Sequence, residues 1–125
     1  MNYIDRFSAN VEHGYYYTKD YIDGDRERLR GVRKAFSSAC TLEVTACTSG
    51  FHGGDSGHGS RTVIGFRDLG GTDIKVVPIP PVSGNGGCEL HLGGDCELAI
   101  LIDALRFAAD SLEKLAEETE DTQAD

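Results

Sequence analysis

Apolar and polar residues alternate in the middle of the chain, most clearly at residues 41–47, where Leu42, Val44 and Ala46 are separated by threonine and glutamate. A period of two residues is typical of a β-strand with one buried face. Three further segments are rich in β-branched, aromatic or alternating apolar residues and are bounded by glycine or proline: 61–68, 72–79 and 88–92. They predict a small antiparallel sheet of about four strands.

A helical period follows this region and is the strongest pattern in the chain. Leu98, Leu101 and Leu105 begin a stripe of apolar residues that recur three and four positions apart through residues 95–118. Asp95 is a favourable N-cap residue and follows two glycines. The stripe is wider than a few short strands cover, so we expect this helix to pack on another subunit as well as on the sheet.

A shorter basic helix is expected before the sheet, at residues 25–39, where apolar residues lie three and four positions apart from Leu29 to Phe36. Residues 1–24 have no clean period and indicate an arm or short elements. Residues 119–125 are acidic and polar, which is typical of a solvated tail. The whole chain is therefore predicted to form a single α+β domain that assembles as an oligomer.

Charge and cysteine content narrow the classes of function. The formal net charge is −9, which argues against unspecific nucleic-acid binding because phosphate contacts need a positive surface. No apolar run is long enough for a bilayer and no basic-then-apolar leader opens the sequence, so we expect a cytoplasmic protein without membrane contact. The four cysteines contain no Cys-x-x-Cys pair and are expected to be reduced thiols. No cofactor is predicted.

The stretch SGFHGGDSGHGSRT, at residues 49–62, has the densest concentration of candidate chemistry. His52, Asp55 and His58 are metal-ligand types spaced three apart. The tetrapeptide GDSG around Ser56 resembles the nucleophile segment of trypsin-like proteases, although the rest of that pattern is missing. The frame GDSGHGSRT resembles a P-loop with its lysine displaced, but a strand rather than a helix follows it. A long hairpin connection is the fourth interpretation.

We favour ligand binding by this loop, since its backbone N–H groups and Arg61 form a weak anion site. Phe51 either stacks on a base or anchors the loop to the core. Asn85 lies in a second glycine-rich loop, at residues 78–87, and is typical of a turn. Arg106 either joins a surface ion-pair ladder or reaches an anion across a subunit boundary.

The basic segment at residues 26–34 allows a second site. Its arginines are usually a solvated face, but at a symmetry axis they would converge on an anion. We predict such a site at Arg26, Arg30 and Arg33. For the first site we predict contacts from five residues: Phe51, His58, Arg61, Asn85 and Arg106.

Three motifs together resemble a known family: the GGDSGHG loop that runs into Arg61, the LGGTD turn at residues 69–73, and the helix that follows GGD at residues 93–95. Over residues 41–110 the chain resembles the first-described family of Thoeris anti-defence proteins, found in phages and prophages. The 78–87 loop has no aromatic residue for stacking on a base, which departs from a site of that kind.

The resemblance implies a non-catalytic sponge. Members of that family sequester cyclic ADP-ribose derivatives made by TIR-domain defence proteins, and some also hold cyclic oligonucleotides. It further implies a homodimer or trimer of dimers with pockets at subunit boundaries, acting in the host bacterial cytoplasm. Two other functions stay open: an acidic inhibitor that mimics nucleic acid on a host defence nuclease, and a small hydrolase that uses the glycine-rich loop.

Overall fold

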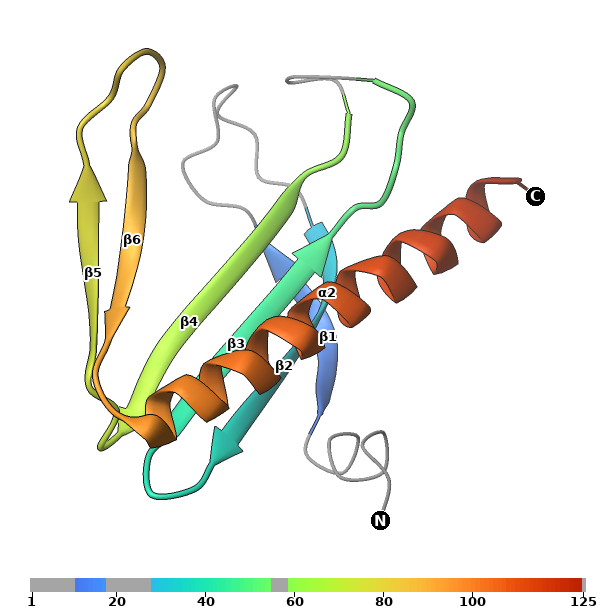
Figure 1. Cartoon of the computed structure of the whole chain (residues 1–125). Coiled ribbons are helices and arrows are strands. Elements are labelled where there is room, and N and C mark those ends of the chain that lie inside the picture. The colour runs from blue at the N-terminus through green and yellow to red at the C-terminus, as the bar shows by residue number, and fades with distance from the viewer. Residues whose placement is uncertain (1–10, 18–27, 55–58, 125) are drawn as a thin grey trace.

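The computed structural model describes residues 11–17, 28–54 and 59–124. The described part of the chain contains six strands and one long helix, in this order: β1 (Glu12–Tyr17), β2 (Arg28–Ser37), β3 (Thr41–Thr48), β4 (Thr62–Gly70), β5 (Ile74–Ile79), β6 (Gly87–Leu92) and α2 (Asp95–Ala124). The first four strands form an antiparallel sheet in sequence order, and β5 and β6 pair as a separate two-stranded sheet (Figure 1). The predicted α+β class is confirmed.

The helix α2 lies diagonally across one face of the four-stranded sheet, over β2 and β3 (Figure 1). The core lies between these two layers. Leu42 and Val44 of β3 have no exposed surface, and they face Ala104 of α2, which is also fully buried. Because side chains alternate along a strand, this face of β3 carries the apolar residues that the sequence showed at every second position.

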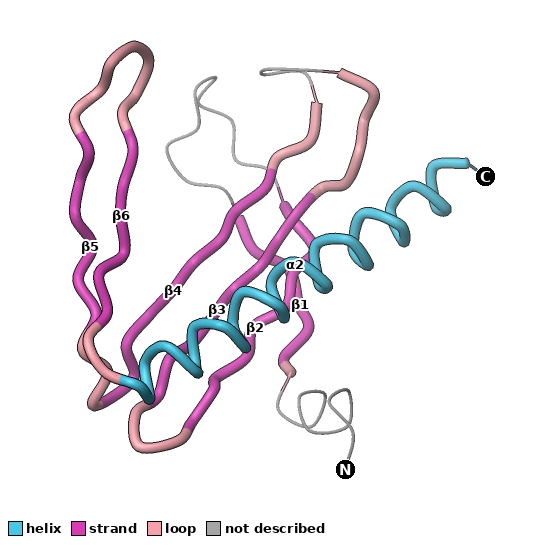
Figure 2. The backbone as a smooth tube through the Cα atoms, in the orientation of Figure 1, coloured by secondary structure: helices cyan, strands magenta, loops and turns pink. Residues whose placement is uncertain are grey.

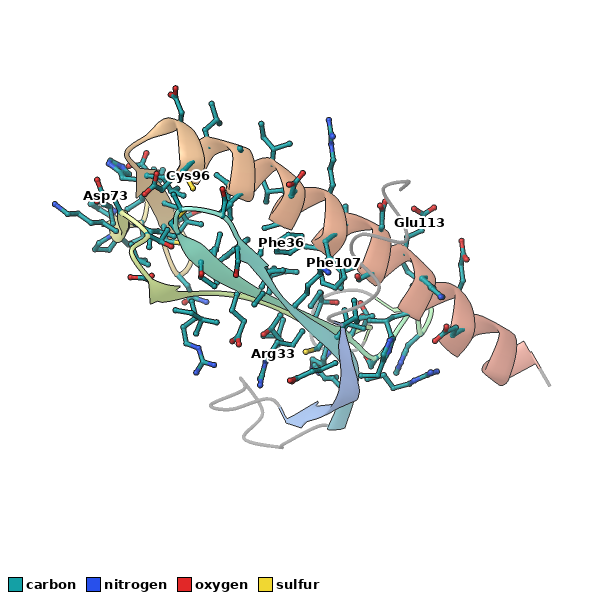
Figure 3. All side chains as sticks on the ribbon, turned by 90° about the horizontal axis from the view of Figure 1, so that it is seen from below. Arg33, Phe36, Asp73, Cys96, Phe107 and Glu113 are labelled. Carbon is teal, nitrogen blue, oxygen red and sulfur yellow. The ribbon has the colours of Figure 1, made fainter. Side chains whose placement is uncertain are left out.

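The central strand β2 contributes Val32, Lys34 and Phe36 to the same face, because they pair with residues of β3 that face the helix. The Phe36 ring meets the Phe107 ring of α2 edge-on, with ring centroids 5.7 Å apart and planes at 68°. Figure 3 shows both rings between the helix and the sheet. Lys34 is only 3% exposed, and its ammonium lies 5.4 Å from the centre of the Phe36 ring.

The helix predicted at residues 25–39 is wrong for residues 28–37, which form the strand β2. Apolar residues at Leu29, Val32 and Phe36 fit a helical stripe, but Val32 and Phe36 are also four apart and share a face of a strand. The residue between them on that face is Lys34, whose charge hid the alternation. Pairing with β1 and β3 on both sides then decides the structure, as tertiary contacts commonly override propensity.

The expected four-stranded sheet is differently composed. The segments 41–47 and 61–68 are neighbouring strands as predicted. Among the described strands, those in 72–79 and 88–92 lie outside the main sheet and pair with each other (Figure 2). Their places are taken by β1, a short element inside the expected N-terminal arm, and by β2.

The start of α2 is fixed by contacts between distant segments. The Leu98 N–H donates to the Gly94 carbonyl at 3.1 Å, so Gly94 occupies the N-cap position that the sequence had suggested for Asp95. Glu97, three residues on, folds back over Gly94 and accepts a hydrogen bond from the Asp73 N–H at 3.0 Å. The helix thus begins at the predicted residue and is joined to the segment that precedes β5.

The far end of α2 extends beyond the predicted limit, since its backbone is helical to Ala124 and includes most of the expected acidic tail. Among the described residues, no helix has the length and apolar content that a bilayer crossing requires.

Candidate functional site

The glycine-rich loop between β3 and β4 is closed at its base by a set of hydrogen bonds. The Ser49 N–H donates to the Arg61 carbonyl at 2.9 Å, and the Arg61 N–H donates to the Ser49 hydroxyl at 2.9 Å. The hydroxyls of Thr48 and Thr62 meet at 3.0 Å, and the Gly50 N–H donates to Thr48 at 3.0 Å. Gly50 and the loop residue Gly53 have φ angles of 83° and 81°, a region that favours glycine. The loop therefore starts from a defined base.

A pocket of about 540 Å³ lies between this loop base and the second half of α2. Its size falls within the range of small-molecule sites, about 300–1,000 Å³. One wall comes from the loop and the adjoining strand ends, and the other from four positions of the helix. The lining residues are Thr48, Gly50, Phe51, Ser60, Thr62, Leu112, Glu113, Ala116 and Glu117.

The helical wall of the pocket follows from the spacing of its residues. Glu113 and Glu117 are four apart, as are Leu112 and Ala116, so the two pairs lie side by side on one face of α2. Ala116 is buried, whereas both glutamates are exposed. The wall therefore presents two carboxylates beside a small apolar surface. Carboxylates accept hydrogen bonds from hydroxyl, amine or amide donors of a ligand.

Phe51 provides the aromatic component of the pocket. Its side chain is 70% exposed, so it is not used as an anchor to the core. An exposed aromatic ring beside hydroxyls and carboxylates has the composition of a site that stacks on a flat ring and hydrogen-bonds its substituents. This exposure argues against the anchoring interpretation, and stacking on a base stays a prediction.

Arg61 occupies a different position from the one its charge suggested. It is only 9% exposed, and its guanidinium donates to the Gly59 carbonyl at 3.0 Å. Arg61 is therefore largely buried and is not part of the pocket lining. Its charge still acts on the loop, because partly buried charges are screened less than exposed ones.

The other predicted contacts are spread over the molecule. Asn85 lies in the turn between β5 and β6, between Gly84 and Gly86, which have φ angles of 77° and 82°. Arg106 is exposed on α2, outside the pocket lining. His58 lies outside the described residues. Of the predicted residues that the structure describes, Phe51 alone lines the pocket.

The predicted second site is not assembled within the protomer. Arg30 and Arg33 are three apart on a strand, so they point to opposite faces of the sheet. Arg30 forms an ion pair of 2.9 Å with Glu118 of α2, whereas Arg33 lies on the other face (Figure 3), 3.7 Å from Glu43. Arg26 lies outside the described residues.

The alternative chemistries for the loop find limited support. His52 donates from Nε2 to the Ser49 carbonyl at 2.9 Å, which uses that nitrogen in the loop base. The other residues of the proposed metal and nucleophile motifs, Asp55, Ser56 and His58, lie outside the described residues. Within the described part of the chain, potential metal ligands gather instead at Cys40, Cys96 and Glu97, far along α2 from the pocket.

Sequence reasoning missed the helical wall of the pocket. Glu113 and Glu117 lie inside the predicted helix at residues 95–118 but were not assigned to a site, although their spacing of four was visible. The threonines Thr48 and Thr62, which flank the glycine-rich loop symmetrically, were a second signal. The residues of α2 that meet the loop depend on where the helix crosses the sheet. That position is set by tertiary packing and cannot be read from local sequence.

No protein-family model, no curated protein and no solved structure matches this chain. The pocket itself therefore carries the functional inference. It combines an aromatic ring, three hydroxyl-bearing side chains, two carboxylates and the backbone of a glycine-rich loop.

Proposed function

We propose that this chain binds a cyclic nucleotide signal derived from ADP-ribose, without converting it, and so withholds it from a host anti-phage defence pathway. The observation that supports this most directly is the pocket beside the glycine-rich loop, with Phe51 on one wall and Glu113 on the other. The resemblance of residues 41–110 to the Thoeris anti-defence family suggests the class of signal.

The pocket's components fit the parts of such a ligand. The purine stacks on the exposed ring of Phe51, since every base offers a flat face to an aromatic side chain. The ribose hydroxyls donate to Glu113 and Glu117, as carboxylates accept ribose hydroxyls in dinucleotide sites. The phosphates face the glycine-rich loop, where backbone N–H groups and the charge of Arg61 favour an anion.

The acidic wall sets the orientation of the ligand. Glu113 and Glu117 repel phosphate, so the two ends of the ligand are distinguished by charge. A phosphate also needs more cationic contact than one buried arginine provides. In this proposal the additional charge comes from Arg106 of a second copy, because Arg106 is exposed beside an apolar surface of α2.

The second part of the proposal is that the chain self-associates through this apolar surface of α2. Leu98, Ile102 and Leu105 are 59%, 41% and 50% exposed, and they lie four and three residues apart on α2. This spacing is the stripe through which helices pair in coiled coils. We infer that the outer face of α2 packs against the same face of a second copy, since a two-fold interface is self-complementary.

Light scattering coupled to size exclusion tests the assembly. Ile102→Glu places a charge in the centre of the stripe and reduces the molecular mass to that of a monomer. Val76→Glu is the matched control, because Val76 is 67% exposed on the separate hairpin and remains outside the stripe. A mass that is unchanged in Ile102→Glu, or monomeric in the unaltered chain, contradicts this part.

Calorimetry with a glycosidically cyclised ADP-ribose tests the binding itself. Phe51→Ala weakens affinity about five- to 150-fold, because stacking on one base contributes about 1–3 kcal/mol. Leu69→Ala is the control, since Leu69 is also exposed and apolar but lies at the other end of β4. After heating the complex, the ligand is recovered intact. No heat at micromolar protein would end this proposal, and released linear ADP-ribose would show an enzyme instead.

A cationic ligand is the competing occupant of an acidic pocket. Spermidine is therefore titrated in parallel, and Glu113→Gln is measured with both compounds. Binding of spermidine alone, abolished by Glu113→Gln, contradicts nucleotide capture. Binding of the cyclised nucleotide with little response to spermidine supports it.

A further inference from the structure

Two cysteines meet at the end of the molecule away from the pocket. Cys40 lies in the turn between β2 and β3, and Cys96 lies in the first turn of α2. Their sulfur atoms are 2.8 Å apart, although the residues are 56 positions apart in sequence. This separation is shorter than the optimal distance of about 3.5–4.0 Å between non-bonded carbon atoms. Cys40 is 3% exposed and Cys96 is half-buried, so the contact is part of the packed structure.

The surroundings give the two thiols different chemistry. The pKa of Cys96 is lowered, chiefly by the hydrogen bond from the Cys40 thiol; burial opposes this, while the backbone N–H groups of Cys40 and Ala39 and the Ser38 hydroxyl add to it. The pKa of Cys40 is raised to about 11, first by the same hydrogen bond and then by burial. These shifts favour Cys96 as the first of the pair to lose its proton, and Cys96 is also the more exposed of the two. A thiolate beside a protonated partner is the arrangement of reactive dithiols.

A metal ion is the alternative occupant, because the Glu97 carboxylate lies within 4.8 Å of both sulfurs. Two features argue against it. Tetrahedral zinc with bonds of about 2.3 Å holds two thiolate sulfurs roughly 3.8 Å apart, whereas these sulfurs lie at 2.8 Å. Glu97 is also engaged, since it folds over Gly94 and accepts the Asp73 N–H. The geometry fits a bond between the sulfurs better than a shared ion.

We propose that Cys40 and Cys96 form a reversible disulfide when the protein meets a peroxide, with Cys96 as the attacking thiolate and Cys40 as the resolving thiol. The Cys96 sulfur attacks one oxygen of hydrogen peroxide, the O–O bond breaks, and the departing hydroxide takes up a proton to form water. Cys40 then attacks the resulting sulfenic sulfur, the S–O bond breaks, and the Cys40 proton leaves with that hydroxyl as a second water. The two thiols lose two electrons in total, and the peroxide accepts them.

The disulfide fastens the start of α2 to the turn between β2 and β3. It closes a chain segment that contains β3, the glycine-rich loop, β4 and the β5–β6 hairpin. Closing a segment of this length restricts the unfolded chain strongly, which corresponds to a rise in unfolding temperature of roughly 10 °C. Cys96 lies in the first turn of α2 and Glu113 lies well along the helix from it (Figure 3), so the disulfide does not alter the pocket directly.

The test uses the full chain, reduced and then exposed to a small excess of hydrogen peroxide. The count of free thiols in denaturant falls from four to two, the mass falls by about 2 Da, and digestion yields a peptide joined through Cys40 and Cys96. The unfolding temperature rises on oxidation and returns on reduction. Cys40→Ser and Cys96→Ser abolish the rise, whereas Cys88→Ser retains it because Cys88 is exposed on β6.

Thiol counting and peptide mapping on the unaltered chain keep the test decisive even if a serine variant folds poorly. Four thiols remaining after oxidation, or linkage only through Cys88 between chains, would overturn the proposal. So would stoichiometric zinc binding that requires both cysteines and occurs without any intramolecular disulfide. Each of these results is independent of nucleotide binding, which is proposed for the pocket farther along α2.

Discussion

Replacement of Leu42 by alanine tests whether the layer between α2 and β3 is the core of this protein. Leu42 is fully buried and belongs to the cluster that joins the sheet to Ala104 and Ala108 of α2. Truncation removes the burial of three carbon atoms and leaves a cavity under the helix. Comparable substitutions cost about 3–5 kcal/mol, and a typical domain has only about 5–15 kcal/mol in total. We expect Leu42→Ala to lower the free energy of unfolding by about 3 kcal/mol.

Urea denaturation followed by circular dichroism measures this loss. With a slope of about 1.5 kcal/mol per molar urea, the midpoint moves down by about 2 M. Leu105→Ala is the matched control, because Leu105 is 50% exposed on the outer face of α2 and its truncation costs less than about 1 kcal/mol in the monomer. A Leu42→Ala midpoint within experimental error of the unaltered chain would refute the assignment of the core. Repeating Leu105→Ala at high protein concentration separates the contribution of a second copy, because an interface adds stability that depends on concentration.

Two further predictions concern a helix terminus and a buried thiol. Gly94→Ala destabilises the fold by about 1–3 kcal/mol, because Gly94 has a φ angle of 120° and an added methyl group meets the Glu97 carboxylate. Gly14→Ala is the control in the same urea assay, because a methyl group added there meets nothing within 4 Å. Equal stability of the two variants would contradict this view of the helix start. Burial raises the pKa of Cys47 from its ordinary value of 9.0 to about 11, despite the nearby Arg33; the unfolded thiol therefore ionises first, so stability falls as pH rises from 9 towards 11. In Cys47→Ala, the free energy of unfolding from urea denaturation no longer shows this decrease between pH 9 and 11. The same pH dependence in both chains would show that Cys47 does not contribute.

The secondary-structure predictions were correct where one local sequence pattern was unambiguous. The strand at residues 41–47 and the first residue of α2 followed from alternation and from a glycine-rich break. The strand β2 was misread because Lys34 occupies a buried position, and burial of a charged side chain depends on neighbours that are distant in sequence. Periodicity also identified β5 and β6 as strands, but it contains no information on which strands pair.

For the candidate site as well, some residues could be recognised from the local sequence, whereas others depend on how the elements pack. The glycine-rich loop and Phe51 were recognisable from the local sequence, but the exposure of Phe51 was not, because burial depends on what packs beside the loop. Glu113 and Glu117 reach the loop only because α2 crosses the sheet diagonally, a packing angle set by side chains of both layers (Figure 1). Arg30 and Arg33 were expected to converge, and the change from helix to strand separates them.

The β5–β6 hairpin has a practical consequence for work on this protein. Its two strands pair with each other and, among the described elements, make no extensive contact with the main sheet or α2. Val82, near its tip, is fully exposed. A peptide tag or fluorescent reporter inserted between residues 82 and 85 would be displayed on a stalk, leaving both the core and the loop pocket unmodified. Such an insertion would allow the protein to be followed in living cells.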